Sequence, residues 1–156
     1  MQNGLRFYNF DIVFAEVPDE TSLAINISGC PNRCPGCHSP HLQENIGEEL
    51  NEEALRVLLG SYGRAITCVC FMGGDSYPGD VACLAGWLKL HYPSLRTAWY
   101  SGKDTIPPEI DLSVFDYVKT GPWITERGPL SSPSTNQRFY RVSGGVMEDI
   151  TRVFRR

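Results

Sequence analysis

Long apolar runs, an export signal and an excess of positive charge are all missing from this sequence. No apolar stretch in the 156 residues approaches the length needed to cross a bilayer. Residues 1–7 lack the apolar core of a signal peptide. The formal net charge of −4 argues against a nucleic-acid partner, because nucleic-acid-binding surfaces are basic. We therefore expect a cytoplasmic protein that has neither a membrane nor a nucleic acid as a partner.

Internal repeats and linker-like stretches are also missing. The composition, with 42% hydrophobic and 21% charged residues, is that of an ordinary globular protein. A chain of this length can bury a real core, so we expect residues 1–156 to form a single domain. The six cysteines come without an export signal and therefore indicate a reducing compartment. In such a compartment thiols bind metals or fill cores rather than form disulfides.

Half of the cysteines lie in one short loop directly after an apolar segment. Its sequence is Cys30-Pro31-Asn32-Arg33-Cys34-Pro35-Gly36-Cys37. Three thiolates can hold three corners of a four-iron cluster and leave the fourth iron open to another ligand. Clusters that only pass electrons usually have four cysteine ligands. The prolines and the glycine stiffen and turn the backbone, so that the three sulfurs can converge.

Two other interpretations of this loop stay open. The three thiolates can bind a structural zinc ion with His38 or His41 as the fourth ligand, since such Cys3His sites are common. The thiols can also have no ligand at all. The other cysteines favour neither interpretation. Cys68 and Cys70 are two residues apart on a predicted strand and share a face, which is typical of small buried hydrophobic residues.

Hydrophobic periodicity predicts alternating strands and helices. Helix starts are marked by an N-cap residue, Asn51, and helix ends by glycines and by Pro93. The order favours an α/β fold with a mostly parallel sheet and right-handed crossovers. The predicted strands are residues 23–27, 67–71, 96–100, 114–118 and 139–142. One predicted helix begins near residue 51, a second begins near residue 81, and a third covers residues 146–154. Residues 121–136 are predicted to form a long loop.

Four polar or glycine-rich segments follow four of these strands. They are the cysteine loop, Gly73-Gly74-Asp75, Ser101-Gly102 and Lys119-Thr120-Gly121. In a parallel sheet the loops after the strands lie at one edge, the carboxyl edge, where α/β folds place ligands. We therefore expect these segments to converge, which a purely structural zinc site would not require.

The segment Gly73-Gly74-Asp75 suits a ligand that resembles an amino acid. Two glycines let the backbone approach a ligand closely and expose its N–H and C=O groups. Those groups can hold the amino and carboxylate ends of the ligand, and Asp75 can pair with an ammonium. The alternative is an ordinary strand-to-helix turn with no ligand.

Taken together, these segments resemble the radical S-adenosylmethionine (radical SAM) superfamily, and within it the activating proteins of anaerobic (class III) ribonucleoside-triphosphate reductases. The cysteine motif is specific to the superfamily, whereas the short length and the late Asn136-Gln137-Arg138 point to the activases. The resemblance covers nearly the whole chain. Its segments are Tyr8-Asn9-Phe10-Asp11-Ile12-Val13, Ile27-Ser28-Gly29-Cys30, Cys34-Pro35-Gly36-Cys37-His38, Met72-Gly73-Gly74-Asp75, Trp99-Tyr100-Ser101-Gly102, Tyr117-Val118-Lys119-Thr120-Gly121-Pro122 and Thr135-Asn136-Gln137-Arg138.

The resemblance implies a partial (β/α) barrel and a catalytic [4Fe-4S] cluster on Cys30, Cys34 and Cys37. S-Adenosylmethionine would bind the open iron, and one electron from a donor such as flavodoxin or ferredoxin would cleave its sulfonium bond. The resulting 5′-deoxyadenosyl radical would take a hydrogen from a glycine of the reductase large subunit. The residues implied to bind S-adenosylmethionine are Gly36, Cys37, His38, Gly73, Gly74, Asp75 and Lys119.

Two rival functions remain. A small radical SAM enzyme can act directly on a purine-like or pterin-like molecule, and a Cys3His module can bind zinc without catalysis. The net negative charge and the lack of a substrate domain fit a protein-activating role better, because a large partner would supply the rest of the active site. In that role, residues 121–136, with Trp123 and Asn136-Gln137-Arg138, are expected to dock the reductase.

Overall fold

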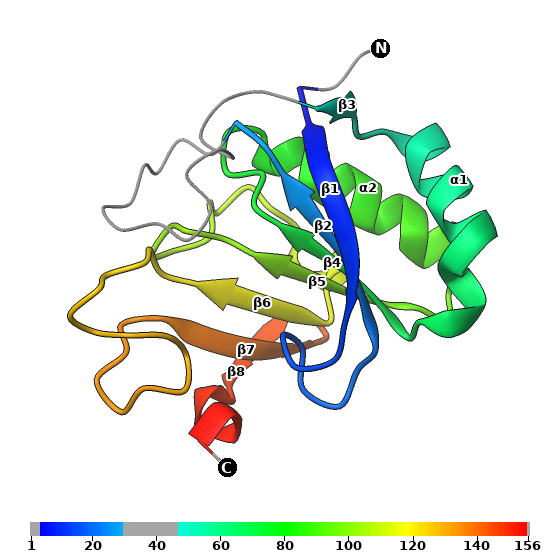
Figure 1. Cartoon of the computed structure of the whole chain (residues 1–156). Helices are drawn as coiled ribbons and strands as arrows, with labels where there is room; N and C mark the ends of the chain where they lie inside the picture. The colour runs from blue at the N-terminus through cyan, green and yellow to red at the C-terminus, as the bar shows by residue number, and fades with distance from the viewer. Residues whose placement is uncertain (1–3, 30–46, 156) are drawn as a thin grey trace.

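The computed structural model describes residues 4–29 and 47–155 (Figure 1). The cysteine loop lies outside these residues. The predictions for Cys30, Cys34, Gly36, Cys37 and His38 are therefore not addressed by the structure. The other predicted site residues, Gly73 to Asp75 and Lys119, are described.

An eight-stranded sheet, in the order β3-β1-β2-β4-β5-β6-β7-β8, runs through the described part of the chain. Two α-helices and short 3₁₀-helices connect the strands. In chain order the elements are β1 (Arg6–Val13), β2 (Ser22–Ile27), β3 (Glu48–Glu49), α1 (Glu52–Tyr62), η2 (Gly63–Ala65), β4 (Cys68–Met72), α2 (Pro78–His91), β5 (Arg96–Tyr100), η3 (Leu112–Val114), β6 (Tyr117–Thr120), β7 (Arg138–Ser143), β8 (Val146–Asp149) and η4 (Thr151–Arg155).

The centre of the sheet is parallel and its flanks are antiparallel. Strands β2, β4, β5 and β6 pair in parallel, in that order. Among the described strands, β1 pairs antiparallel with both β2 and β3, and β7 pairs antiparallel with both β6 and β8. Antiparallel pairings therefore outnumber parallel ones. The α/β class is confirmed, but the predicted mostly parallel sheet is wrong, because antiparallel connections, which need no helix, add strands at both edges.

The signals that predicted the first helix operate as expected. The Asn51 side chain accepts a hydrogen bond of 2.9 Å from the backbone N–H of Ala54 and so caps α1. Glu52 and Glu53 occupy the first turn, where acidic groups favour the helix dipole. The helix buries Leu55, Leu58 and Leu59 and ends at Tyr62, which is exposed.

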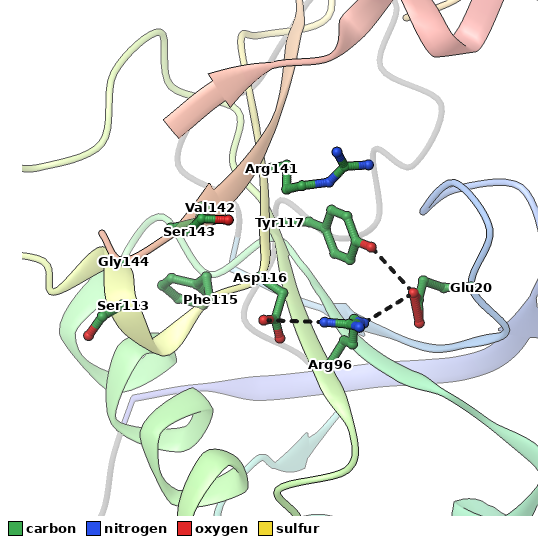
Figure 2. A pocket seen from close by; sticks show the side chains of 10 residues that line it. All are labelled: Glu20, Arg96, Ser113, Phe115, Asp116, Tyr117, Arg141, Val142, Ser143 and Gly144. Atoms are coloured by element: carbon green, nitrogen blue, oxygen red, sulfur yellow. Dashed lines mark hydrogen bonds and ion pairs between the residues drawn. The ribbon is translucent and has the colours of Figure 1, made fainter. Parts of the chain in front are cut away.

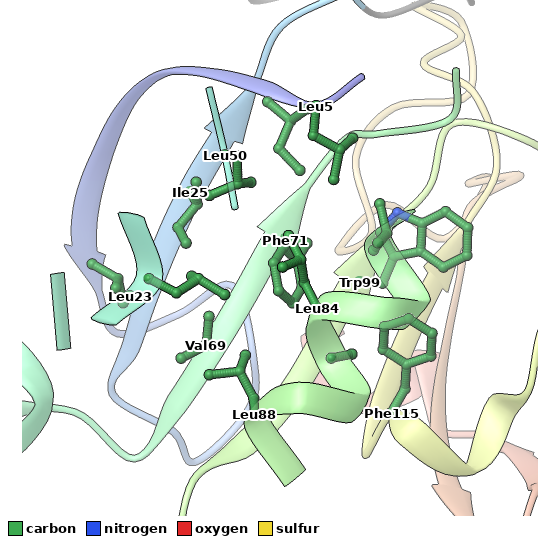
Figure 3. Close-up of a cluster of buried hydrophobic side chains, with 14 of the residues drawn as sticks. Leu5, Leu23, Ile25, Leu50, Val69, Phe71, Leu84, Leu88, Trp99 and Phe115 are labelled. Atoms are coloured by element: carbon green, nitrogen blue, oxygen red, sulfur yellow. The ribbon is translucent and has the colours of Figure 1, made fainter. Parts of the chain in front are cut away.

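The main core lies between the helices and one face of the sheet. A row of paired residues crosses the four parallel strands, namely Ile25, Phe71, Trp99 and Val118, and all four are almost fully buried. Figure 3 shows Phe71 and Val69 of β4 facing Leu84 and Leu88 of α2. These contacts fix α2 against β4 and β5 and thereby fix the direction of the loop that joins β4 to α2.

A second, smaller core lies on the opposite face of the sheet. It combines strand residues with Val17 of the β1–β2 connection, Leu130 of the long loop and Ile150 near the C-terminus. Cys68 and Cys70 are fully buried in it and form no disulfide, as predicted for small hydrophobic residues. Cys83, on α2, is exposed.

The C-terminal segment differs from its prediction. Residues 146–154 have an apolar spacing that predicts a helix, but they form β8 and then η4. Gly144 and Gly145 have positive φ values of 57° and 78° and make a two-residue hairpin turn from β7 to β8. The Asp149 side chain then accepts bonds from the backbone N–H and hydroxyl of Thr151, which starts η4.

The sixth strand is displaced from its predicted position. Residues 112–114 form η3, and β6 follows at residues 117–120 rather than at 114–118. The Thr97 hydroxyl donates a 2.6 Å hydrogen bond to the Val114 carbonyl. The Thr97 N–H donates a 2.9 Å bond to the Asp116 carboxylate. These bonds hold the approach to β6 out of the sheet. Residues 121–136 contain no helix or strand, as predicted.

The two α-helices among the described residues have 11 and 14 residues. None of them is long and apolar enough to cross a membrane.

The described cysteines should differ sharply in reactivity. Burial raises the pKa of the Cys68 thiol to about 12 and the pKa of Cys70 well above its usual value, so neither forms the reactive thiolate at mildly alkaline pH. We expect iodoacetamide to alkylate Cys83 in the native protein and Cys68 and Cys70 only after unfolding, as mapped by peptide mass spectrometry. Native labelling of Cys70 as fast as Cys83 would contradict the second core.

Candidate functional site

The described loops after β4, β5 and β6 meet at the carboxyl edge of the sheet, as predicted for these three segments; the fourth, the cysteine loop, lies outside the described residues. In Figure 1 the arrowheads of β2, β4, β5 and β6 point toward the same side of the molecule. The Ser76 hydroxyl, just after Gly73-Gly74-Asp75, donates a 2.7 Å hydrogen bond to the Gly29 carbonyl. Gly29 directly precedes Cys30 in the sequence. The glycine-rich loop after β4 is therefore joined to the residue from which the cysteine loop departs.

The glycine pair after β4 adopts a backbone that favours glycine. Gly73 and Gly74 have φ values of 112° and 95°. The Gly73 N–H donates to the Tyr100 carbonyl at 3.0 Å, and the Trp99 indole N–H donates to the Gly73 carbonyl at 2.7 Å. The buried indole thus holds the turn against β5.

Gly74 also permits close packing of α2. A Cβ atom at Gly74 would lie 2.5 Å from Cγ2 of Val81, a distance that requires something to shift. Val81 is fully buried at the start of α2. A side chain at Gly74 would therefore clash with the core. The packing of α2 is enough to explain why glycine stands here, as in an ordinary strand-to-helix turn.

Asp75 joins the loop after β4 to the loop after β5. One carboxylate oxygen accepts a 2.6 Å bond from the Ser101 hydroxyl, and the other accepts a 2.8 Å bond from the Gly102 N–H. The predicted ligand role of Asp75 stays a prediction, and its bonds to Ser101 and Gly102 are an additional role that the sequence did not indicate.

Lys119 is a buried lysine at the end of β6. Only 8% of the residue is exposed. Its ammonium donates to the Ser101 carbonyl at 3.1 Å and to the Gly121 carbonyl at 2.7 Å. It also lies over the ring of Tyr100, 5.8 Å from the centroid. Burial raises the pKa of the Tyr100 hydroxyl well above its usual value, so this ring stays neutral beside the ammonium.

The long loop after β6 is held by its own hydrogen bonds. Gly121, with a φ of 104°, donates its N–H to the Lys103 carbonyl at 2.7 Å. Near the other end, the Asn136 amide donates to the Pro122 carbonyl at 3.0 Å. Between them, Arg127 Nε donates to the Ser134 carbonyl at 2.7 Å, and the Ser134 hydroxyl donates back to the Arg127 carbonyl at 2.9 Å.

A pocket of about 420 Å³ opens beside this edge. Asp75 and Trp99 line it together with the segment that follows Gly102. Residues 103–108 were not predicted as part of a site, although their position after β5 places them at the carboxyl edge. Their proline pair, Pro107-Pro108, was the available signal. The complete lining is Asp75, Pro78, Trp99, Lys103, Asp104, Thr105, Ile106, Pro107 and Pro108.

Another pocket, of about 570 Å³, lies at the start of β5 and β6, far along the strands from the predicted site (Figure 2). Its charges are largely paired with one another. Arg96 lies 3.6 Å from Glu20 and 4.0 Å from Asp116, and Tyr117 donates to Glu20 at 3.3 Å. Burial, and then the nearby Glu20 charge, raise the pKa of Tyr117. This balance of charge gives the pocket no clear preference for a ligand.

The described residues contain no group of three or more His, Cys, Asp or Glu side chains that could hold a metal ion. The predicted metal ligands Cys30, Cys34 and Cys37 all belong to the loop outside this part of the chain. The iron–sulfur and zinc interpretations of that loop therefore stand as they did on sequence. What the structure adds is the arrangement of the edge at which Gly29, the residue before this loop, contacts Ser76.

Comparison of the chain with protein-family models, with curated proteins and with solved structures gave no match.

Replacing Gly74 by alanine should destabilise the protein. The positive φ costs an alanine roughly 1–3 kcal/mol, and the added Cβ would lie 2.5 Å from Val81. We expect a clear fall in Tm, measured by thermal circular dichroism. Gly60→Ala is the matched control, because its Cβ would meet no atom within 4 Å, and alanine in a helix gains about 0.5–1 kcal/mol over glycine.

The outcome that decides between the two interpretations of the glycine pair is specific. If Gly74→Ala keeps the wild-type Tm but binds S-adenosylmethionine much more weakly, the glycine serves a ligand rather than the packing of α2.

Proposed function

We propose that this chain is a radical SAM activating enzyme that generates a glycyl radical on an anaerobic ribonucleotide reductase. The observation that carries the proposal is the contact between Ser76 and Gly29. It joins the loop that contains Gly73-Gly74-Asp75 to the residue that precedes the three-cysteine motif. The residue that follows one motif therefore contacts the residue that precedes the other, although the two motifs are more than thirty residues apart in sequence, and this contact supports the proposal that they belong to one site.

The donor set fits an iron–sulfur cluster. Cys30, Cys34 and Cys37 would hold three irons, which suits a cluster that keeps one iron for a ligand. When bound, the cluster supplies the single electron that cleaves S-adenosylmethionine. Gly36, His38 and the Gly73–Asp75 segment would hold the cofactor beside it, and Cys37 contributes as a ligand of the neighbouring iron.

The residues of the described edge contribute by binding and orientation. Trp99 fixes the Gly73 carbonyl at 2.7 Å, so the glycine turn keeps one conformation at this edge. Ser101 and Gly102 hold the Asp75 carboxylate in place. In this proposal the carboxylate pairs with the ammonium of the ligand. In this proposal the parallel strands β2, β4, β5 and β6 are the part of the sheet that corresponds to a partial (β/α) barrel.

The substrate in this proposal is a glycine in a peptide loop of the reductase large subunit. The chain's own surface offers the long loop after β6 as a docking element. Its bonds between Arg127 and Ser134 brace the loop, while Ile124 at its outer part is 38% exposed. A braced loop with an exposed apolar residue can bind a partner at a small entropic cost. The electron would come from a flavodoxin or a ferredoxin.

One observation favours the small-molecule alternative. The pocket of about 420 Å³ beside Asp75 and Trp99 lies within the range of small-ligand sites. A radical SAM enzyme acting on a purine-like or pterin-like molecule could use it. The zinc-binding module remains the third candidate, and it predicts no role for the ordered edge after β4, β5 and β6.

Replacing any one of Cys30, Cys34 and Cys37 by alanine should remove both iron and activity. After anaerobic reconstitution with iron and sulfide, the wild type should be brown and form 5′-deoxyadenosine from S-adenosylmethionine and a reductant. Each variant should lose most of the brown colour and form little 5′-deoxyadenosine, because two thiolates do not hold the cluster. Cys83→Ala is the control, since Cys83 is exposed on α2 and lies outside the motif.

The same preparation separates the alternatives. One equivalent of zinc that persists, with no uptake of iron, would support the Cys3His module and overturn the proposal. Product formation that needs a purine-like or pterin-like compound, and is indifferent to the reductase, would support the small-molecule enzyme.

Altering the outer part of the long loop should uncouple cofactor cleavage from radical transfer. The triple change Ile124→Gly, Thr125→Ser and Glu126→Gly keeps Arg127 and the backbone bonds that Ile124 accepts. We expect slow cleavage of S-adenosylmethionine to persist while the glycyl radical on the reductase, measured by electron paramagnetic resonance, falls at least about tenfold. Val146→Ser, at the more exposed hairpin between β7 and β8, is the control. A normal radical yield from the triple variant would exclude this docking role.

A further inference from the structure

The buried ammonium of Lys119 connects two of the loops at the carboxyl edge. It donates to the carbonyl of Ser101 after β5, at 3.1 Å, and to the carbonyl of Gly121 after β6, at 2.7 Å. A charged group that is 8% exposed needs such partners, because removing it from water without them is costly. The ammonium and the two carbonyls therefore hold each other in place.

Ser101 is the residue on which these contacts converge. It is 1% exposed. Its N–H donates to the Lys119 carbonyl at 2.8 Å, and its carbonyl accepts from the Lys119 ammonium. Its hydroxyl donates to Asp75 at 2.6 Å and accepts from the Lys103 N–H at 3.1 Å. A single buried serine thus links a carboxylate from the loop after β4 to an ammonium from the end of β6.

The charges of this network also match. Asp75 and Lys119 have opposite charges and bind the hydroxyl and the carbonyl of the same residue. In a buried network each bond polarises the next, and a network in which the members are satisfied is rigid. Breaking it at Lys119 would leave the Ser101 and Gly121 carbonyls without their charged donor, at a position where water has little access.

We propose that Lys119 is a positioning residue, which fixes the loops after β5 and β6 relative to each other and so pre-forms the ligand-binding edge. This inference deepens the proposed function and rests on it for the identity of the ligand. It gives Lys119 a different role from the one implied by the resemblance, in which the ammonium binds the carboxylate of S-adenosylmethionine directly.

Two ligands separate the two roles. The reconstituted full chain is titrated anaerobically with S-adenosylmethionine and with decarboxylated S-adenosylmethionine, for the wild type and for Lys119→Met. If Lys119 is a positioning residue, Lys119→Met should weaken the binding of both ligands by the same factor, about tenfold or more. If the Lys119 ammonium contacts the carboxylate directly, Lys119→Met should weaken only the binding of S-adenosylmethionine. Arg64→Met is the matched control, because it also removes a positive charge, but from an exposed side chain of η2, which precedes β4 and lies away from the carboxyl edge.

Amide hydrogen exchange gives a readout that needs no ligand. The Gly102 N–H binds Asp75, and the Gly121 N–H binds the Lys103 carbonyl. Lys119→Met should speed the exchange of both amides, and Arg64→Met should not. If Lys119→Met does not fold, Ser101→Ala serves instead: it keeps the carbonyl that Lys119 binds but loses the hydroxyl bond to Asp75, and it should speed the exchange of Gly102.

The outcomes are distinct. Wild-type exchange and wild-type affinities in Lys119→Met, or wild-type exchange in Ser101→Ala, would overturn the positioning role. A loss restricted to S-adenosylmethionine would overturn it as well and assign Lys119 to the ligand. If the wild type binds neither ligand, the proposed function fails, and the exchange of Gly102 and Gly121 still tests the network.

Discussion

The parallel pairing of β2, β4, β5 and β6 is the constraint on which the rest of the site depends. A row of buried side chains, Ile25, Phe71, Trp99 and Val118, crosses these strands and holds their register. If one of these strands slipped by one residue, its buried side chains would point to the opposite face of the sheet. Since the register is fixed by burial, the four strand ends are level, and the loops that follow them meet at one edge.

The edge itself is held by polar rather than apolar contacts. Trp99 binds the Gly73 carbonyl, Asp75 binds Ser101 and Gly102, and Lys119 binds the Ser101 and Gly121 carbonyls. Each such bond adds only about 1 kcal/mol net, but losing a partner in a buried site costs about 1–3 kcal/mol. The network therefore contributes more to a defined geometry than to stability, which is what a ligand-binding edge requires.

The flanks of the sheet show where local patterns lose their predictive value. Residues 146–154 carry apolar side chains at helical spacing, yet Gly144 and Gly145 return the chain along β7 and make residues 146–149 a strand. The Gly-Gly signal for a two-residue hairpin was present in the sequence. It competed with a helical period, and pairing with β7 decided the result.

The sequence by itself determined the elements whose signals are local and strong: α1 with its Asn51 cap, the apolar strands at the centre of the sheet, and the three-cysteine motif. It also determined which loops follow which strands. Only the tertiary structure decided that Gly74 faces Val81, that Asp75 binds the Ser101 hydroxyl, and that the Lys119 ammonium is buried between two carbonyls. The partners in these contacts, whether near or distant in sequence, are chosen by sheet register, by helix packing and by the need to satisfy buried polar groups, none of which a local pattern records.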